Sequence, residues 1–208
     1  MRGEAIGAVV LGVVMCAPAP EEVNSRMATP ATLTATFQAT DQALEIRYTL
    51  TNTGREPLFV INVAVRVSPQ GTTVEVGRPR VELTRDRQLL LLSRLPPWDR
   101  SVSYAAPPAA YATHLPVGQT ERITIEMPLP LVPENLPPPR DKEDVRELLV
   151  QRVSFLLGVL PASAAPRAAE QEIAGVKLWR LPVFEALPHQ IELKAEAALP
   201  GVRVLAPR

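Results

Sequence analysis

The chain has 208 residues, of which 46% are apolar, and its 22 basic and 22 acidic residues give a formal net charge of zero. A chain of this length can bury one substantial hydrophobic core. Because a neutral chain has no long-range attraction for polyanions, the charge balance argues against nucleic acid as a partner. The 23 prolines cluster between apolar runs, a pattern that predicts short strands separated by Pro-rich loops.

The first thirty residues have the organisation of an export signal followed by a tether. An uncharged apolar run covers 5–15; a membrane-spanning helix needs about 20 such residues, whereas the shorter run is typical of a secretory signal. Cys16 follows directly and is the only cysteine, which excludes an internal disulfide. The stretch up to Pro30 mixes proline with polar residues, and this predicts a flexible tether over 16–30.

Val13-Val14-Met15-Cys16 resembles the lipobox of bacterial lipoproteins. In that family the cysteine becomes the first residue of the mature chain and carries the lipid. The resemblance implies a signal peptide over 1–15, lipid attachment at Cys16, and anchorage to a membrane of the bacterial cell envelope. An uncleaved anchor helix and a plain buried cysteine are the alternatives.

From Ala31 onward, apolar and polar residues alternate with a period of two, the pattern of strands with one buried face. The clearest case is 44–50, in which every even-numbered residue is apolar. Gly54 and Pro57 then predict a turn. The same reasoning predicts further strands over 31–38, 58–67, 73–76, 80–84, 88–95, 109–114 and 123–127.

The stretch 141–160 fits two structures, because its apolar residues recur both at helical spacing and at every second position. We expect a helical turn over 141–148 followed by a strand over 150–160. Later strands are expected over 176–181, 191–197 and 202–205, with a turn at Pro200-Gly201. Residues 31–208 are thus predicted to form a single domain, in which the C-terminal strands complete the sheets.

The segment EIRYTLTNTGREPLFVINVAV, from Glu45 to Val65, resembles the second and third strands of immunoglobulin-like domains in bacterial exported proteins. In such domains an Asn-Thr-Gly corner joins two central strands. The resemblance implies an all-β fold, an immunoglobulin-like antiparallel β-sandwich with Pro-rich loops behind the flexible N-terminal signal and tether. It implies no functional residues.

No set of residues has the spacing of a catalytic or cofactor-binding motif. His114 and His189 are the only histidines and lie too far apart for the usual paired zinc ligands, so we expect them on surface loops. The adjacent carboxylates Glu143 and Asp144 belong to a mixed-charge run that is typical of solvated surface. The sequence therefore predicts a protein that is not an enzyme and holds neither cofactor nor metal.

Arginines are dense between Arg78 and Arg100. On strands they could contact an acidic partner or an anionic polymer, or they could protect a sheet edge against aggregation. Arg85, Arg87 and the loop residue Trp98 are the candidate partner contacts. The sequence favours a non-catalytic binding or assembly module at the cell envelope. The alternatives are an accessory structural subunit of an envelope complex and an envelope hydrolase with a site of scattered residues.

Overall fold

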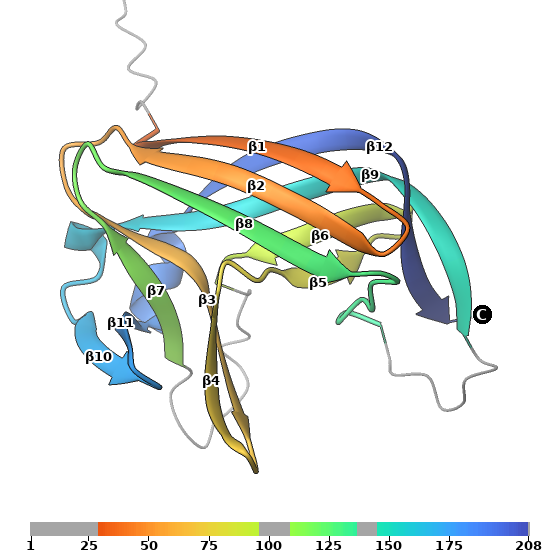
Figure 1. Ribbon diagram of the computed structural model, residues 1–208. Coiled ribbons are helices and arrows are strands. Elements are labelled where there is room, and N and C mark those ends of the chain that lie inside the picture. Colours follow the sequence, from red (N-terminus) through yellow and green to blue (C-terminus); the bar gives the residue numbers. More distant parts are fainter. Residues whose placement is uncertain (1–28, 96–108, 137–144, 208) are drawn as a thin grey trace, which may run out of the picture.

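The computed structural model describes residues 29–95, 109–136 and 145–207, and β-strands dominate these residues (Figure 1). The strands are β1 (Ala31–Ala39), β2 (Ala43–Asn52), β3 (Leu58–Ser68), β4 (Gly71–Val76), β5 (Arg80–Leu83), β6 (Gln88–Ser93), β7 (Ala109–Leu115), β8 (Thr120–Pro128), β9 (Val145–Pro161), β10 (Ala169–Ile173), β11 (Val176–Pro182) and β12 (Ile191–Pro207). Three short helical segments accompany them: η2 (Ala162–Ala164), α1 (Val183–Ala186) and η3 (Leu187–His189). The predicted all-β class is confirmed.

The first sheet consists of β1, β2 and β8, in the antiparallel order β1-β2-β8. Buried and exposed side chains alternate along β2 as the sequence predicts, and its even-numbered residues from Leu44 to Leu50 are buried. The odd-numbered neighbours Glu45, Arg47 and Thr49 lie on the solvent side. One face of this sheet therefore belongs to the core, and the other is polar.

The second sheet has β3, β9 and β12 as neighbours, with β7 on the other side of β3. Together with β1-β2-β8, this order matches the A-B-E and C′-C-F-G strand arrangement of immunoglobulin-like sandwiches. Beyond that frame, β11 and β10 extend the sheet past β7, β6 pairs with β9, and β5 pairs with β6. The β6–β9 pair is parallel, so the sheet is mixed rather than purely antiparallel.

The main core lies between the two sheets, and an aromatic pair crosses it. Tyr48 on β2 and Phe155 on β9 are both buried, with ring centroids 5.2 Å apart. These strands hold the positions at which antibody domains place their inter-sheet disulfide. In this chain, the contact between two buried, tilted rings connects the sheets in place of a covalent bond.

The Asn-Thr-Gly corner between β2 and β3 is built around the side chain of Asn52, which is 1% exposed. Its Nδ2 donates to the carbonyl oxygens of Glu56 and Leu115, at 3.0 Å each. Its Oδ1 accepts from the backbone N–H of Gly54, also at 3.0 Å. One amide thus fixes the corner and connects it to β7.

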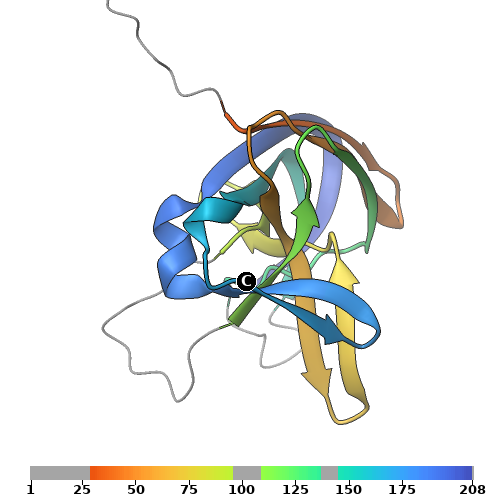
Figure 2. The ribbon, with the colours of Figure 1, turned by 90° about the vertical axis from the view of Figure 1, so that its left-hand side faces the viewer.

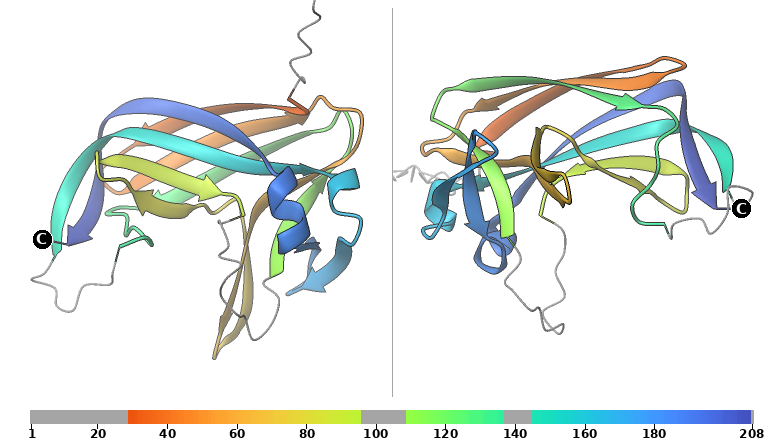
Figure 3. Two further views of the ribbon diagram at one scale, coloured as in Figure 1. Left: turned by 180° about the vertical axis from the view of Figure 1, so that it is seen from behind. Right: turned by 60° about the horizontal axis from the view of Figure 1, so that its bottom comes forward.

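The expectation of a helical turn over 141–148 is wrong for the residues that the structure describes, because Val145 to Leu148 already belong to β9. β9 pairs with β12 from Val145 to Val159, and this pairing satisfies backbone groups that a helix would have satisfied internally. The expected turn at Pro200-Gly201 is absent from the structure of this described segment. The pairing of β12 with β9 instead shifts register between Ala198 and Val202, and 191–207 form one strand. Figure 3 shows β9 and β12 side by side. Residues 141–144 lie outside the described residues.

A second, smaller core lies on the outer face of the second sheet, where α1 covers it (Figure 3). Phe59 and Leu160 contribute from β3 and β9, and Val183 and Ala186 from α1. Neither α1 nor β10 was predicted from the sequence. Both are five residues or fewer, too short to show a clear period.

Of the predicted tether, only Thr29 and Pro30 are described. The carbonyl oxygen of Pro30 accepts a hydrogen bond from the backbone N–H of Thr53 at 3.0 Å, and the next residue, Ala31, is buried. The chain therefore joins the fold at Pro30, beside the Asn52 corner.

Candidate interaction surfaces

The candidate partner residues fall into two groups. Cys16 and Trp98 lie outside the described residues. Arg85 and Arg87 are exposed in the turn between β5 and β6. The structure therefore places two of the four predicted contact and attachment residues, and it places them together.

The β5–β6 turn is held by its own hydrogen bonds. The backbone N–H of Arg87 donates to the carbonyl of Thr84 at 3.1 Å, and the Thr84 hydroxyl donates to Asp86 Oδ1 at 2.5 Å. Arg152 on β9 binds the Asp86 carboxylate from outside the turn at 2.8 Å. The Thr84 hydroxyl first, then the backbone hydrogen bond at Asp86 and then Arg152 hold the pKa of Asp86 below its usual range. Arg87, at a φ of 58°, projects from a fixed backbone.

Other arginines of the dense stretch are neutralised by carboxylates. Arg78 pairs with Glu75, Arg80 with Glu82, and Arg94 with Glu192. Within the described residues, Arg85 and Arg87 form no ion pair. The local positive charge is therefore concentrated in the β5–β6 turn, and the remaining described arginines of the stretch stabilise the surface of the sheet.

A polar chain crosses the sheet next to this turn. Gln88 donates to the Ser154 hydroxyl at 2.6 Å, Ser154 donates to Glu196 at 2.8 Å, and Lys194 pairs with Glu196 at 2.6 Å. Lys194 first, and then Ser154, lower the pKa of Glu196. A hollow of about 400 Å³ lies over these side chains. Ser154 is fully buried, so its hydroxyl is not placed to attack a substrate.

The β3–β4 hairpin projects from the body of the protein (Figures 1 and 2). Strand pairing gives it one apolar face. Pairing places Val63 opposite Val76 and Val65 opposite Val74, with Val67 next along β3. Val67 is 82% exposed and Val76 41% exposed. We call these five residues the valine face. The sequence showed three of these valines in one register but gave no sign that they would face solvent, because buried strands have the same pattern.

The opposite face of the hairpin is polar. Arg66 pairs with Glu75 at 3.1 Å, and Arg78 approaches the same carboxylate at 3.3 Å. At the base of the valine face, Val63 and Val65 meet Leu95 and Tyr111 around a hollow of about 210 Å³. The hairpin therefore presents a continuous apolar surface that runs from its tip into a concavity.

The histidines are exposed, as expected, but neither lies on a loop, because His114 belongs to β7 and His189 ends η3. The His114 ring is 5.9 Å from that of Phe59 and 5.6 Å from that of Trp179, which come from the two neighbouring strands. Among the residues that the structure describes, no three His, Cys, Asp or Glu side chains form a group that could hold a metal ion. The His114 ring extends the second core as part of an aromatic cluster.

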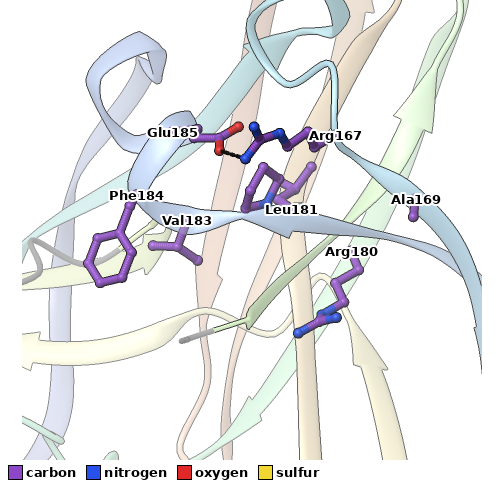
Figure 4. A pocket seen from close by; sticks show the side chains of 8 residues that line it. Arg167, Ala169, Arg180, Leu181, Val183, Phe184 and Glu185 are labelled. Atoms are coloured by element: carbon purple, nitrogen blue, oxygen red, sulfur yellow. Dashed lines mark hydrogen bonds and ion pairs between the residues drawn. The ribbon is translucent and has the colours of Figure 1, made fainter. Parts of the chain in front are cut away.

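A hollow of about 360 Å³ lies beside α1 and β11 (Figure 4). Arg167 and Glu185 pair above it at 2.8 Å, and Leu181 lies beneath them. Arg180 extends from the opposite side of β11. Of the two arginines that line the hollow, Arg167 is thus paired with Glu185, whereas Arg180 forms no ion pair with any described residue.

Glu121 is the one acidic residue of β8 that alternation places on the inner side of the first sheet. It lies opposite Leu50 on β2, and its Oε2 is buried without a hydrogen-bond partner among the described residues. Asn62 and Tyr48 form the polar surroundings, with Asn62 Nδ2 donating to Tyr48 Oη at 3.4 Å. Burial raises the pKa of the Glu121 carboxyl, and the hydrogen bond from Asn62 opposes this in part.

We expect Glu121→Gln to stabilise the fold at neutral pH. The pKa of Glu121 in the folded state is above its usual value of 4.5. The folded wild-type protein therefore holds this proton more tightly than the unfolded chain does, and its free energy of unfolding falls as pH rises from 4.5 through the folded-state pKa. The uncharged amide removes this loss, so the two melting temperatures should converge in acid and separate towards pH 7. Thermal melts across that range measure the difference, and Glu126→Gln on the solvent face of β8 is the control. A constant difference at all pH values would contradict the burial of a charged Glu121.

Comparisons with known proteins found no matching family model, no similar curated protein and no similar solved structure. Over the described ranges, none of the helices has the length and apolar character needed to cross a membrane.

Proposed function

We propose that this chain is a non-catalytic assembly module of the bacterial cell envelope, and that its β3–β4 hairpin docks on a partner protein. The valine face carries this proposal. A two-stranded hairpin is marginally stable in water, and an apolar face on such a hairpin gains free energy when another surface covers it. Full burial of an exposed valine side chain contributes about 1.5–3 kcal/mol. A partner that covers the hairpin would gain most of one such increment at Val67, which is 82% exposed, and a fraction of one at Val76, which is 41% exposed.

The position of the hairpin supports the proposal. The chain enters the fold at Pro30 on the side of the first sheet, whereas the hairpin extends from the opposite side (Figures 1 and 2). A lipid on Cys16 would tether the protein from the entry side. The valine face would then be available to a component that lies away from the anchoring membrane.

A second contact is proposed at the β5–β6 turn, for an acidic surface of the same or another partner. Arg85 and Arg87 are exposed, carry no ion pair in the described residues, and stand on a turn that Asp86 and Arg152 fix in place. Because the backbone of the turn is already fixed, binding a carboxylate-rich surface would have to order only the two side chains. Arg85→Glu with Arg87→Glu should weaken capture of such a partner.

If the proposed localisation is correct, the Cys16→Ala variant should no longer be found in the membrane fraction. Wild-type protein should incorporate a palmitate analogue and sediment with membranes, because a lipid is the proposed anchor. The variant should do neither. A wild-type protein that is unlabelled and soluble would contradict the lipid anchor, and it would leave the hairpin proposal to its own test.

The docking proposal predicts site-specific cross-linking from the hairpin. A photoreactive amino acid at Val67 in the full chain, irradiated in intact cells, should give a discrete higher-mass adduct. Val132 is also exposed, at 60%, and lies away from the hairpin, so the same amino acid at that position is the control. Adducts of equal yield from both positions, or none from position 67, would contradict docking through the valine face.

A further inference from the structure

Strand β8 forms one edge of the first sheet (Figure 1). The odd-numbered residues of this strand direct their backbone groups towards β2, because the flanking residues Gln119 and Leu129 are hydrogen-bonded to the backbone at the two ends of β2, at 3.0 and 2.7 Å. The N–H and C=O groups of Arg122, Thr124 and Glu126 therefore point away from β2, and no described strand pairs with them. This edge can accept another strand.

The edge at β8 is open, whereas the edge of the second sheet at β5 is closed. Glu134 and Asn135 bind the outward backbone groups of Val81 and Leu83 on β5, at 2.7 and 3.0 Å. β8 runs for nine residues, pairs with β2 without a bulge, contains no lysine, and has its one proline, Pro128, as its last residue. Bulges, lysines and internal prolines are common means of preventing edge-to-edge pairing, and β8 has none of them.

Two charged side chains on the solvent side of β8 have no partner among the described residues. Arg122 forms no ion pair with any of them. Glu126 forms none either, and it lies opposite Glu45 on β2, which Arg47 already neutralises at 2.7 Å. Arg122 and Glu126 cannot pair with each other, because four residues along a strand span about 13 Å. A strand added at the edge could supply the opposite charge to each.

A second copy of β8 has these charges at the required positions. When two β8 strands pair antiparallel about Thr124, Arg122 of each copy lies opposite Glu126 of the other. The backbone groups of these residues all point outward, so the hydrogen bonds and the two ion pairs form in the same register. On the inner side of the sheet, this register places Ile123 opposite Ile125 of the second copy, which continues the apolar side of the sheet across the edge.

Neighbouring registers do not satisfy the charges. Pairing centred on Arg122 or on Glu126 sets that side chain opposite its own copy, and like charges directly opposite each other are destabilising. A centre at Ile123 places Arg122 opposite Thr124. A centre at Ile125 places it opposite Pro128, which has no N–H to donate. Among these five registers, the one about Thr124 alone forms both ion pairs, and it has the two-fold symmetry of an isologous dimer.

We propose that the protein forms a homodimer through its β8 edges, so that two three-stranded sheets become one continuous six-stranded sheet. The two-fold axis is perpendicular to this sheet, so the outer faces of both copies lie on the same side. Both chains then enter their folds on one side of the dimer, which is compatible with two lipid anchors in one membrane. The interface is separate from the hairpin and from the β5–β6 turn, and it does not depend on the partners proposed for them.

The test is sedimentation velocity of the purified full chain in a non-ionic detergent over a range of protein concentrations. The wild type should show an equilibrium between monomer and dimer. Arg122→Glu and Glu126→Arg should each weaken dimerisation by about tenfold or more, because each variant converts both ion pairs into like-charge pairs. An equimolar mixture of the two variants should dimerise again, since every glutamate then lies opposite an arginine. The double variant should dimerise by itself for the same reason.

Arg146→Glu is the matched control. Arg146 is exposed on β9 and forms no ion pair with a described residue, so the same change of charge should leave dimerisation as in the wild type. In a second measurement, Thr124→Cys should give a disulfide-linked dimer under mild oxidation, because this side chain lies next to its own copy at the two-fold axis. Thr34→Cys, two strands away on β1, should not. Melting curves check that all variants fold, which is expected because each substituted side chain faces solvent.

The proposal is overturned if the wild type sediments as a monomer at every concentration, or if mixing the Arg122→Glu and Glu126→Arg variants does not restore the dimer. It is also overturned if Val67→Asp abolishes dimerisation and Arg122→Glu does not. That last result would place the contact between copies at the valine face instead of the β8 edge.

Discussion

Leu50→Asp is expected to leave the protein largely unfolded at neutral pH. Leu50 is fully buried in β2 between Leu33 on β1 and Glu121 on β8. The substitution removes a buried leucine, places an unpaired carboxylate in the core and sets it directly opposite a second acidic group. Together these cost about 5 kcal/mol or more, against a total stability of about 5–15 kcal/mol for a domain.

The matched control is Thr49→Asp, one residue away on the solvent side of the same strand. Its carboxylate would lie opposite Arg122 and Thr34, so we expect a change of about 0.5 kcal/mol or less. Circular dichroism and urea unfolding of both variants measure the contrast. If Leu50→Asp unfolds at the wild-type urea concentration, the two faces of β2 have been assigned the wrong way round.

Asn52→Asp should destabilise the fold by about 3–5 kcal/mol. The carboxylate can still accept the Gly54 N–H, but it cannot donate to the carbonyls of Glu56 and Leu115, which lie 3.0 Å from the present Nδ2. A buried charge would then face two carbonyl oxygens. Since protonation restores one donor, the loss should grow as pH rises.

Asn135→Asp is the control for this substitution. Asn135 makes the same kind of paired contact with the backbone of Leu83, but it is exposed to solvent. We expect a loss of about 1 kcal/mol there. Urea unfolding at two pH values measures both variants, and equal losses would mean that the corner is not the buried hydrogen-bonded unit described above.

The sequence predicted strands best where one face is buried and the other solvated. In β2 and β8 the alternation identifies both the strand and its inward residues, because a half-buried strand requires that pattern. It could not decide between helix and strand at Val145 to Leu148, where apolar residues suit either period. There the outcome depends on β12, which lies more than forty residues further along the chain.

The candidate surfaces were predictable only in part. Arg85 and Arg87 stood out by charge density, and they remain unpaired in the described residues because Asp86, the nearest carboxylate, is occupied by Thr84 and Arg152. The partners of Arg78, Arg80 and Arg94 include Glu192, a residue distant in sequence. The valine face depends on which strands become neighbours, and local patterns do not contain this information.

The two-sheet arrangement places the hairpin and the β5–β6 turn, and the Tyr48–Phe155 contact is its most direct signature. In a nuclear Overhauser experiment on the full chain with assigned aromatic resonances, ring protons of Tyr48 should give cross-peaks to those of Phe155. At a centroid separation of 5.2 Å these cross-peaks should be readily detected. Assigned rings without a cross-peak between them would contradict the packing of β2 against β9 and the sandwich on which every surface described above depends.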